Sequence, residues 1–327
     1  MIEQVLALRY LTSSMNTADA ATKPGAGFLS ELSAGWRAMP NKGFFFGLLA
    51  AWVALFQFLG NSMFNFLDTP SLFGWMDFHY HAMDDNQYCE YVPLVVLALF
   101  WWKRKELVAV PKDLWPPALG LVALALALHI FGYMAQQQRI SIVAFFLGLY
   151  GLTGLAWGRE WLRASFFPFF MFAFTMPMAE VADVVTFPLR VLVTVISVGI
   201  CKCIGLDVIR DGTQIFDAQH TFAYDVAPAC SGIRSLTALL ALTTVLGFMT
   251  YRSGWKRAAM MFASIPLAVA GNVLRLMFII VTAETFGQEA GNYVHESEWL
   301  SLLPYLPVFA AWIWLQRRYH EGGEDEA

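Results

Sequence analysis

The chain has 327 residues, of which 58% are hydrophobic and only 14% charged, with a formal net charge of -4. Its mean hydropathy is +0.53, which excludes a soluble globular protein of this length and predicts a polytopic, all-α membrane protein. Basic residues are sparse and lie between apolar runs, so we expect no nucleic-acid partner. Four cysteines, Cys89, Cys201, Cys203 and Cys230, are too few for a disulfide framework.

The two ends of the chain are polar and the middle is apolar. Residues 1–42 lack the pattern of a cleaved signal peptide, so we expect a cytoplasmic segment there. Residues 317–327 predict a disordered, acidic cytoplasmic tail. Residues 43–316 are expected to form a single transmembrane domain, because most of their apolar runs approach the roughly 20 residues that a spanning helix needs. These runs are 43–60, 88–102, 114–135, 140–157, 162–179, 184–204, 230–250, 258–284 and 299–316.

Clusters of basic residues indicate the topology, because such clusters stay on the cytoplasmic side. They are Arg37 with Lys42, Lys103 to Lys105, Arg159 with Arg163, Arg252 with Lys256 and Arg257, and Arg317 with Arg318. A full crossing by residues 184–204 would put the fourth cluster outside. That run contains Pro188 and Arg190, so we expect an interfacial or re-entrant helix there. About eight helices then span the plasma (inner) membrane.

With this topology, residues 205–229 lie on the outer side. Two β-favouring runs flank Asp211-Gly212, which is a typical hairpin turn. We therefore expect a small outer β-hairpin just before the helix that contains Cys230.

Cys230 lies where this polar segment becomes an apolar helix. Pro228 favours a helix start two residues earlier,, and the amides and dipole of a helix N-terminus lower the pKa of a thiol. The thiol is therefore placed to be a nucleophile, although a small structural cysteine would also fit. Arg234 shares its helix face,, and an intramembrane arginine must face the bundle interior, for a structural pair or for chemistry.

The next apolar run contains Gly271-Asn272-Val273-Leu274-Arg275. Starting near Ala258, about 17 residues at roughly 1.5 Å each place Arg275 near the outer boundary. Ser264, Ala268, Asn272 and Arg275 then share one small and polar face, suited to close packing against the cysteine helix,. Alternatively, Arg275 only extends its side chain to water.

His295 precedes the last apolar run. A loop histidine is usually a solvated surface group, but here Cys230, Arg275 and His295 all fall on the outer side. Together they could supply a nucleophile, an oxyanion donor and a general acid or base.

A competing metal site is Asp77-Phe-His79-Tyr-His81 with Asp84 and Asp85, in the first outer loop. Two histidines and nearby carboxylates could bind zinc, but the segment lacks a defined third ligand. We interpret His129 and His220, and the pair Cys201 and Cys203, as structural.

These residues give the chain a resemblance to the exosortase and archaeosortase family. The motifs are Ala229-Cys-Ser-Gly-Ile-Arg-Ser-Leu236, Asn272-x-x-Arg275, a histidine before the last span, and Gly205 and Arg210-x-Gly212 upstream. The match is clear over residues 160–316, and the cysteine block is its most specific part.

The resemblance implies a membrane cysteine endopeptidase or transpeptidase that cleaves C-terminal sorting tails of the PEP-CTERM kind from exported proteins. Cys230 would be the nucleophile, Arg275 the oxyanion donor and His295 the acid, with Ser231, Arg234 and Asn272 in support. A thioester would pass to water or to a lipid or polysaccharide acceptor, with no cofactor or metal. The sequence departs from the family pattern at Gly271, often Ala, and at Glu298, commonly Gly.

A second hypothesis is a non-enzymatic transporter or assembly scaffold, suggested by Arg234 and Asn272 within apolar runs. It predicts a continuous polar path between the two faces of the membrane. A third is a membrane metallohydrolase built on His79 and His81.

Overall fold

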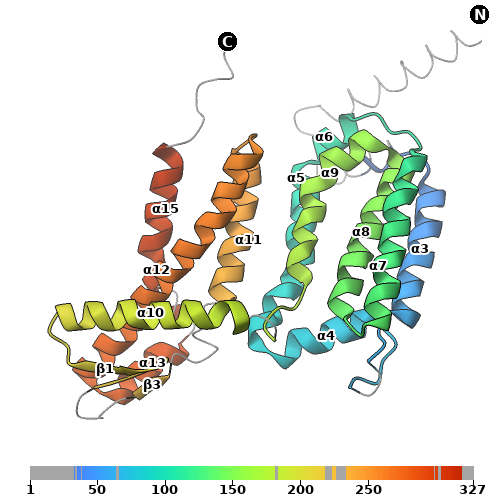
Figure 1. The fold of residues 1–327 in the computed structure, drawn as a ribbon. Helices are drawn as coiled ribbons and strands as arrows, with labels where there is room; N and C mark the ends of the chain where they lie inside the picture. Colours follow the sequence, from blue (N-terminus) through green and yellow to red (C-terminus); the bar gives the residue numbers. More distant parts are fainter. Residues whose placement is uncertain are drawn as a thin grey trace, which may run out of the picture. The chain divides into compact units, whose positions relative to one another are not determined.

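The computed structural model describes residues 33, 35–37, 39–63, 66–180, 183–217, 223–225, 233–297, 299–300 and 303–318. The chain forms two compact units, the first made of Met1–Ala82 with Cys89–Pro177 and the second of Met83–Tyr88 with Met178–Ala327. Each unit is built mainly from helices (Figure 1).

Unit 1 is a bundle of apolar helices. Its elements are α3 (Lys42–Leu59), α4 (Leu72–Ala82), α5 (Val92–Trp102), α6 (Arg104–Ala109), η2 (Pro116–Ala118), α7 (Leu119–Met134), α8 (Gln138–Trp157), α9 (Arg159–Met171) and η3 (Phe172–Thr175); η1 (Asp84–Tyr91) begins in unit 2 and ends in unit 1. α3 and α8 approach closely at Gly148, where a Cβ atom would lie 1.9 Å from the Trp52 ring. The Trp52 indole N–H donates to the Phe145 carbonyl, 3.0 Å away, so this buried contact is also satisfied in its hydrogen bonding.

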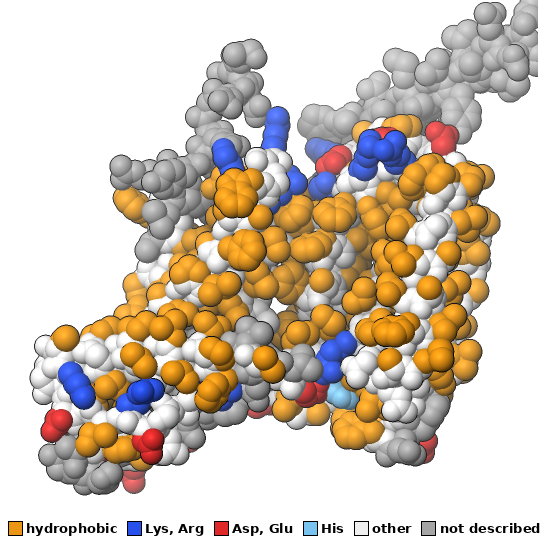
Figure 2. All heavy atoms as spheres, viewed as in Figure 1, with side chains coloured by type: hydrophobic (Ala, Val, Ile, Leu, Met, Phe, Trp, Pro, Cys, Tyr) orange, Lys and Arg blue, Asp and Glu red, His pale blue; other side chains and the backbone are white. Residues whose placement is uncertain are grey.

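One end of unit 1 carries most of its basic residues, Arg139 at the start of α8 being an exception. α3 and α9 begin at this end and α5 finishes there (Figure 1). Lys103 Nζ donates to the Ala164 carbonyl at 2.7 Å, which brings the first basic cluster after α5 against α9. Figure 2 shows Lys and Arg side chains at this end and hydrophobic side chains over the sides of the bundle. The pattern is the one that the positive-inside rule predicts.

Unit 2 combines near-parallel and crosswise helices. Its elements are α10 (Asp183–Cys203), β1 (Val208–Asp211), β2 (Gln214–Asp217), β3 (Ala223–Asp225), α11 (Ile233–Thr250), α12 (Gly254–Phe286), α13 (Gln288–Glu296), η5 (Leu303–Tyr305) and α15 (Leu306–Arg318). Figure 1 shows α10 lying across the direction of α11, α12 and α15. Its outward side is apolar, with Phe187, Val195 and Ile200 exposed, which suits a helix at a membrane interface.

The sheet of unit 2 has three antiparallel strands in the order β1-β2-β3. β1 and β2 form the expected hairpin, with Asp211 opposite Gln214 and Gly212 in the turn at φ 59°. Glycine adopts this left-handed conformation without a Cβ penalty. The third strand pairs Phe216 of β2 with Ala223 and was not anticipated from the sequence.

α12 is longer than a membrane crossing requires. Its 33 residues correspond to about 50 Å at 1.5 Å per residue, against about 30 Å of hydrocarbon. The excess lies at the end beyond Arg275, where α12 enters a small hydrophobic core with α10, the first two strands and α13. The fully or almost fully buried members of this core are Cys201, Val208, Ile215, Ile279 and Ile280. We call this end of unit 2 the sheet end.

The prediction of an all-α polytopic membrane protein is confirmed. Among the described residues, five helices are long and apolar enough to cross a membrane, and α10 is one of them; Leu236–Thr250 and Leu303–Trp314 are shorter apolar helices. α5 and α9 have only 11 and 13 residues. The number of eight crossings, the single domain 43–316 and the cytoplasmic position of its two ends remain predictions.

Candidate active site

The sheet end brings Arg275 of α12 close to His295 of α13. Gly287, at φ 91°, ends α12 and reverses the chain, so that α13 packs back along α12. Val294 anchors α13 in the hydrophobic core. The Arg275 guanidinium then donates from Nη2 to the backbone carbonyl of His295, 3.4 Å away. Two of the three predicted catalytic residues therefore lie side by side.

The Arg275 guanidinium keeps donors for a further partner. Its Nε atom is buried and has no hydrogen-bond partner among the described residues. A guanidinium carries five N–H donors, and the contact with His295 uses one of them. Such a group is suited to stabilise an oxyanion that forms beside it.

The imidazole of His295 is half-buried at this site. Burial lowers its pKa from the ordinary 6.5, the positive charge of Arg275 lowers it further, and the Glu296 carboxylate partly offsets both effects. The ring is therefore biased toward its neutral form, in which one nitrogen can accept a proton. This form is the one that a general base needs.

Asn272 lies one turn before Arg275 and is buried. Its Oδ1 accepts a hydrogen bond from the hydroxyl of Tyr305, in η5. The Tyr305 ring covers Gly271, where a Cβ atom would lie 2.3 Å from two ring carbons. Gly271 is therefore the residue that admits this ring.

The segment that leads to the cysteine is tied to the helix that bears the histidine. The backbone N–H of Ala223, in β3, donates to Gln288 Oε1 at 3.0 Å, and Gln288 Nε2 donates to Asn292 Oδ1 at 3.0 Å along α13. Cys230 and Ser231 lie outside the described residues, as do Pro228, Glu298 and His220. Arg234 is in the first turn of α11, with its side chain outside the description.

A family model for the transmembrane exosortase matches residues 75–302, about 70% of the chain. This chain belongs to the transmembrane exosortase family. The matched range contains β3, the cysteine segment, α12 and α13. Comparisons with curated proteins and with solved structures give no match.

The predicted metal-binding segment of this exosortase is a helix rather than a loop. Because His79 and His81 are two residues apart on α4, they point to different sides. His79 is buried, hydrogen-bonds the Trp75 carbonyl at 2.8 Å and stacks on the Trp75 ring at 3.7 Å. His81 is exposed and contacts the Asp77 carbonyl and the Glu90 carboxylate, at 2.9 and 3.1 Å.

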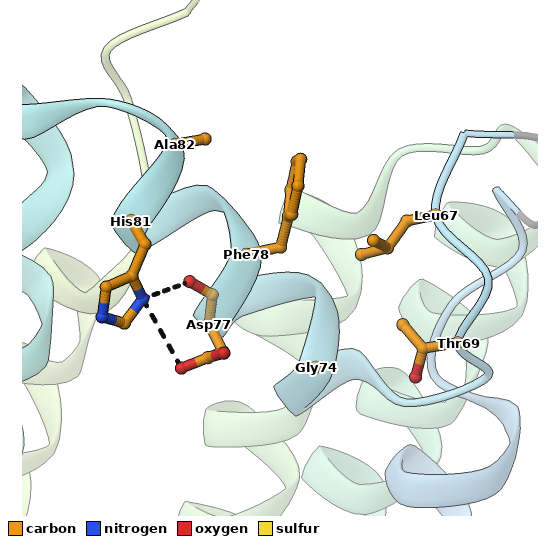
Figure 3. A pocket seen from close by; sticks show the side chains of 7 residues that line it. All are labelled: Leu67, Thr69, Gly74, Asp77, Phe78, His81 and Ala82. Atoms are coloured by element: carbon orange, nitrogen blue, oxygen red, sulfur yellow. Dashed lines mark hydrogen bonds and ion pairs between the residues drawn. The ribbon is translucent and has the colours of Figure 1, made fainter.

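Figure 3 shows His81 turned toward Asp77 at the edge of an open hollow whose other lining residues are Leu67, Thr69, Gly74, Phe78 and Ala82. This lining is mostly apolar and offers few oxygen or nitrogen ligands. Within the described part of the chain, no three His, Cys, Asp or Glu side chains are grouped as metal ligands. The arrangement does not bring the two histidines together.

The buried hydroxyl groups of α11 and α12 bear on the transporter hypothesis. Thr243 and Thr244 donate to the Leu240 carbonyl at 3.1 and 2.6 Å, and Ser264 donates to the Met261 carbonyl at 2.6 Å. Each of these hydroxyls thus donates to its own helix, as is common in membranes. They do not form a chain of contacts between the two ends of the unit.

Two features of this site were not found by reasoning from the sequence. Tyr305 lies in an apolar run before the last helix, and nothing in the run separates it from other membrane tyrosines. Gln288 is one of several polar residues after Gly287. Both contacts depend on tertiary packing of α12, which local pattern does not encode.

Proposed function

We propose that this exosortase is a cysteine endopeptidase or transpeptidase that cleaves C-terminal sorting tails of exported proteins at the outer face of the membrane. The observation that carries the proposal is the contact of Arg275 with His295. This contact joins a guanidinium with several N–H donors to the residue that carries a half-buried imidazole. Both lie in the same unit as β3, the strand that precedes Cys230 along the chain. A nucleophilic thiol is the one group that such a pair lacks for acyl transfer.

In the first half-reaction, the Cys230 thiol loses its proton to the His295 imidazole and attacks the scissile carbonyl carbon. A C–S bond forms, and the oxyanion accepts hydrogen bonds from Arg275. When the tetrahedral intermediate collapses, the C–N bond breaks and His295 returns the proton to the leaving amine. A thioester remains on Cys230 and the tail leaves with a new amino terminus.

In the second half-reaction, a nucleophile attacks the thioester and the C–S bond breaks. Water gives a free carboxylate, whereas a hydroxyl or amine on a lipid or polysaccharide carrier gives an ester or amide. In each case the proton of the nucleophile returns through His295 to the thiolate. No cofactor or metal is needed in this sequence of steps.

The charge distribution of unit 2 supports an outer site. Arg252, Lys256 and Arg257 lie around the start of α12, whereas Arg275 and His295 lie toward its other end. Because basic clusters stay in the cytoplasm, this end faces the outer, periplasmic side. A substrate anchored by its own transmembrane helix would present the residues before that helix at this level.

The test compares two cysteines of the same unit. Cys230→Ala should abolish processing of a reporter that ends in a sorting signature, a transmembrane helix and a basic end. Cys203→Ala, at an exposed cysteine of α10, should process the reporter normally. A reporter peptide should leave an acyl group on Cys230 that mass spectrometry detects and hydroxylamine removes. Normal processing by the inserted Cys230→Ala protein would overturn the proposal.

A further inference from the structure

Tyr305 follows α13 along the chain and contacts α12, the helix that bears Arg275. It is ten residues after His295 along the chain and is 6% exposed. η5, which contains it, packs against α12. Leu303–Tyr305, which follow α13 along the chain, are therefore held against α12.

The contact has a polar and a steric part. The phenol hydroxyl donates to Asn272 Oδ1, and both residues are buried. The ring lies on Gly271, where no side chain larger than hydrogen fits without displacing it. A buried hydrogen bond combined with close packing fixes a position more narrowly than either alone.

The contact between Tyr305 and Asn272 lies close to Arg275. Asn272 precedes Arg275 by three residues, so the two are neighbours on one helix face. Tyr305 thus contacts α12 about one turn from Arg275. Along the chain, Tyr305 is also linked covalently to His295, ten residues earlier. A shift of η5 along α12 would move the end of α13 relative to the guanidinium.

We infer that Tyr305 is a positioning residue, which acts through Asn272 and Gly271 to hold His295 against Arg275. The effect of Tyr305 on catalysis rests on the proposed function, whereas its effect on the position of His295 does not. In this role Tyr305 does not contact the substrate.

The first measurement is the titration of His295, followed by NMR of protein with ¹³C-labelled histidine in detergent. The His295 resonance is assigned by its loss in His295→Gln. Among the described residues, the charged groups that shift the pKa of this ring are Arg275 from α12 and Glu296 from α13. In Tyr305→Phe, which keeps the ring and removes the hydroxyl, the His295 pKa should rise toward its ordinary value as the guanidinium moves away.

Tyr293→Phe is the matched control, because it removes an exposed hydroxyl from α13 itself. It should leave the His295 titration and the turnover unchanged. Asn272→Ala removes the acceptor and should shift the titration as Tyr305→Phe does. The double variant should shift it no further, because the two single changes break the same contact.

The second measurement is the turnover of a tailed reporter peptide per folded molecule. Tyr305→Phe should lower kcat by about tenfold with little change in KM, since small displacements of catalytic groups cost one to two orders of magnitude. A shifted titration with unchanged turnover would retain the positioning role and overturn the catalytic role of His295. An unchanged titration, with or without slower turnover, would overturn the inference and leave Tyr305 a packing residue.

Discussion

The guanidinium of Arg275 donates to the backbone carbonyl of His295, with 3.4 Å between Nη2 and O. The two residues come from different helices, and Gly287 reverses the chain between them. Since the contact uses the backbone carbonyl of His295, it orients the last turn of α13 without engaging the imidazole. The same cation lowers the pKa of that imidazole.

Two variants of Arg275 should separate the effect of its positive charge from the effect of its planar hydrogen-bonding geometry. Arg275→Gln should lower kcat for a tailed reporter by about 10²–10³-fold, the loss typical of an oxyanion donor. Arg275→Lys keeps the charge but loses the planar fork, so it should also be slow. The two variants differ at His295, whose pKa should rise in Arg275→Gln and stay low in Arg275→Lys. Lys202→Gln, at an exposed cation of α10, is the control and should have no effect.

Glu296 should tune the pH dependence of cleavage. The Glu296 carboxylate raises the pKa of His295, against the lowering by burial and by Arg275. Since the general base must be neutral, activity should fall as pH drops through the His295 pKa, which lies below 6.5. Glu296→Gln removes the raising effect and should move this acid limb to lower pH.

Glu289→Gln is the matched control for that shift. Glu289 is an exposed acid in the first turn of the same helix, and it is not among the charges that act on His295. Its variant should keep the acid limb of the wild-type protein. An equal shift in both variants would mean that the effect comes from net charge and not from contact with the imidazole.

Much of this architecture follows from the sequence, because lipid imposes strong constraints on it. All nine apolar runs, from 43–60 to 299–316, contain a helix, and the turn at Gly212 is where the Asp-Gly pair predicted it. Helical spacing also placed Asn272 on the buried face of α12. These features depend on hydropathy and local propensity, which a single sequence displays.

The remaining features depend on contacts between distant segments. The reversal at Gly287 makes a helix of the expected loop around His295, and the ring of Tyr305 makes Gly271 a packing position. The helix with His79 and His81 begins after Ser71, whose Oγ accepts a hydrogen bond from the Gly74 N–H at 3.1 Å, and this capping serine was not recognised in the sequence. For Gly271 and for α13 the packing partner lies on another element, so periodicity along the chain could not predict it.

Gly271→Ala should destabilise the protein although alanine is the better helix former. Its Cβ atom would lie 2.3 Å from the Tyr305 ring, and such overpacking typically costs about 1–3 kcal/mol. Gly199→Ala is the matched control on α10, where a Cβ atom meets nothing within 4 Å. It should be neutral or stabilising by roughly 0.5–1 kcal/mol. Thermal unfolding in detergent compares the two, and an equally stable Gly271→Ala would show that the ring moves aside freely.

Chelation should separate the thiol mechanism from a metal-dependent one. His79 and His81 face different partners, Trp75 and Glu90, so treatment with EDTA should leave reporter cleavage unchanged. His81→Ala should behave like the wild-type protein, because the ring lies at the exposed edge of α4. Loss of activity on chelation, restored by added zinc, would contradict this expectation.

Gln288 should couple the strand before Cys230 to the helix that bears His295. Gln288→Leu removes the acceptor for the Ala223 N–H, whereas Gln288→Glu keeps a carboxylate oxygen in its place. We therefore expect several-fold slower cleavage in Gln288→Leu and near-normal cleavage in Gln288→Glu, because one exposed hydrogen bond contributes about 0.5–1.5 kcal/mol. The rate of Cys230 alkylation by iodoacetamide, read by peptide mass spectrometry, gives a substrate-free measure. Cys203, exposed in the same unit, is the internal standard. The Cys230-to-Cys203 alkylation ratio and the cleavage rate could both be the same in Gln288→Leu and Gln288→Glu. That result would show that the hydrogen bond between β3 and α13 is not needed.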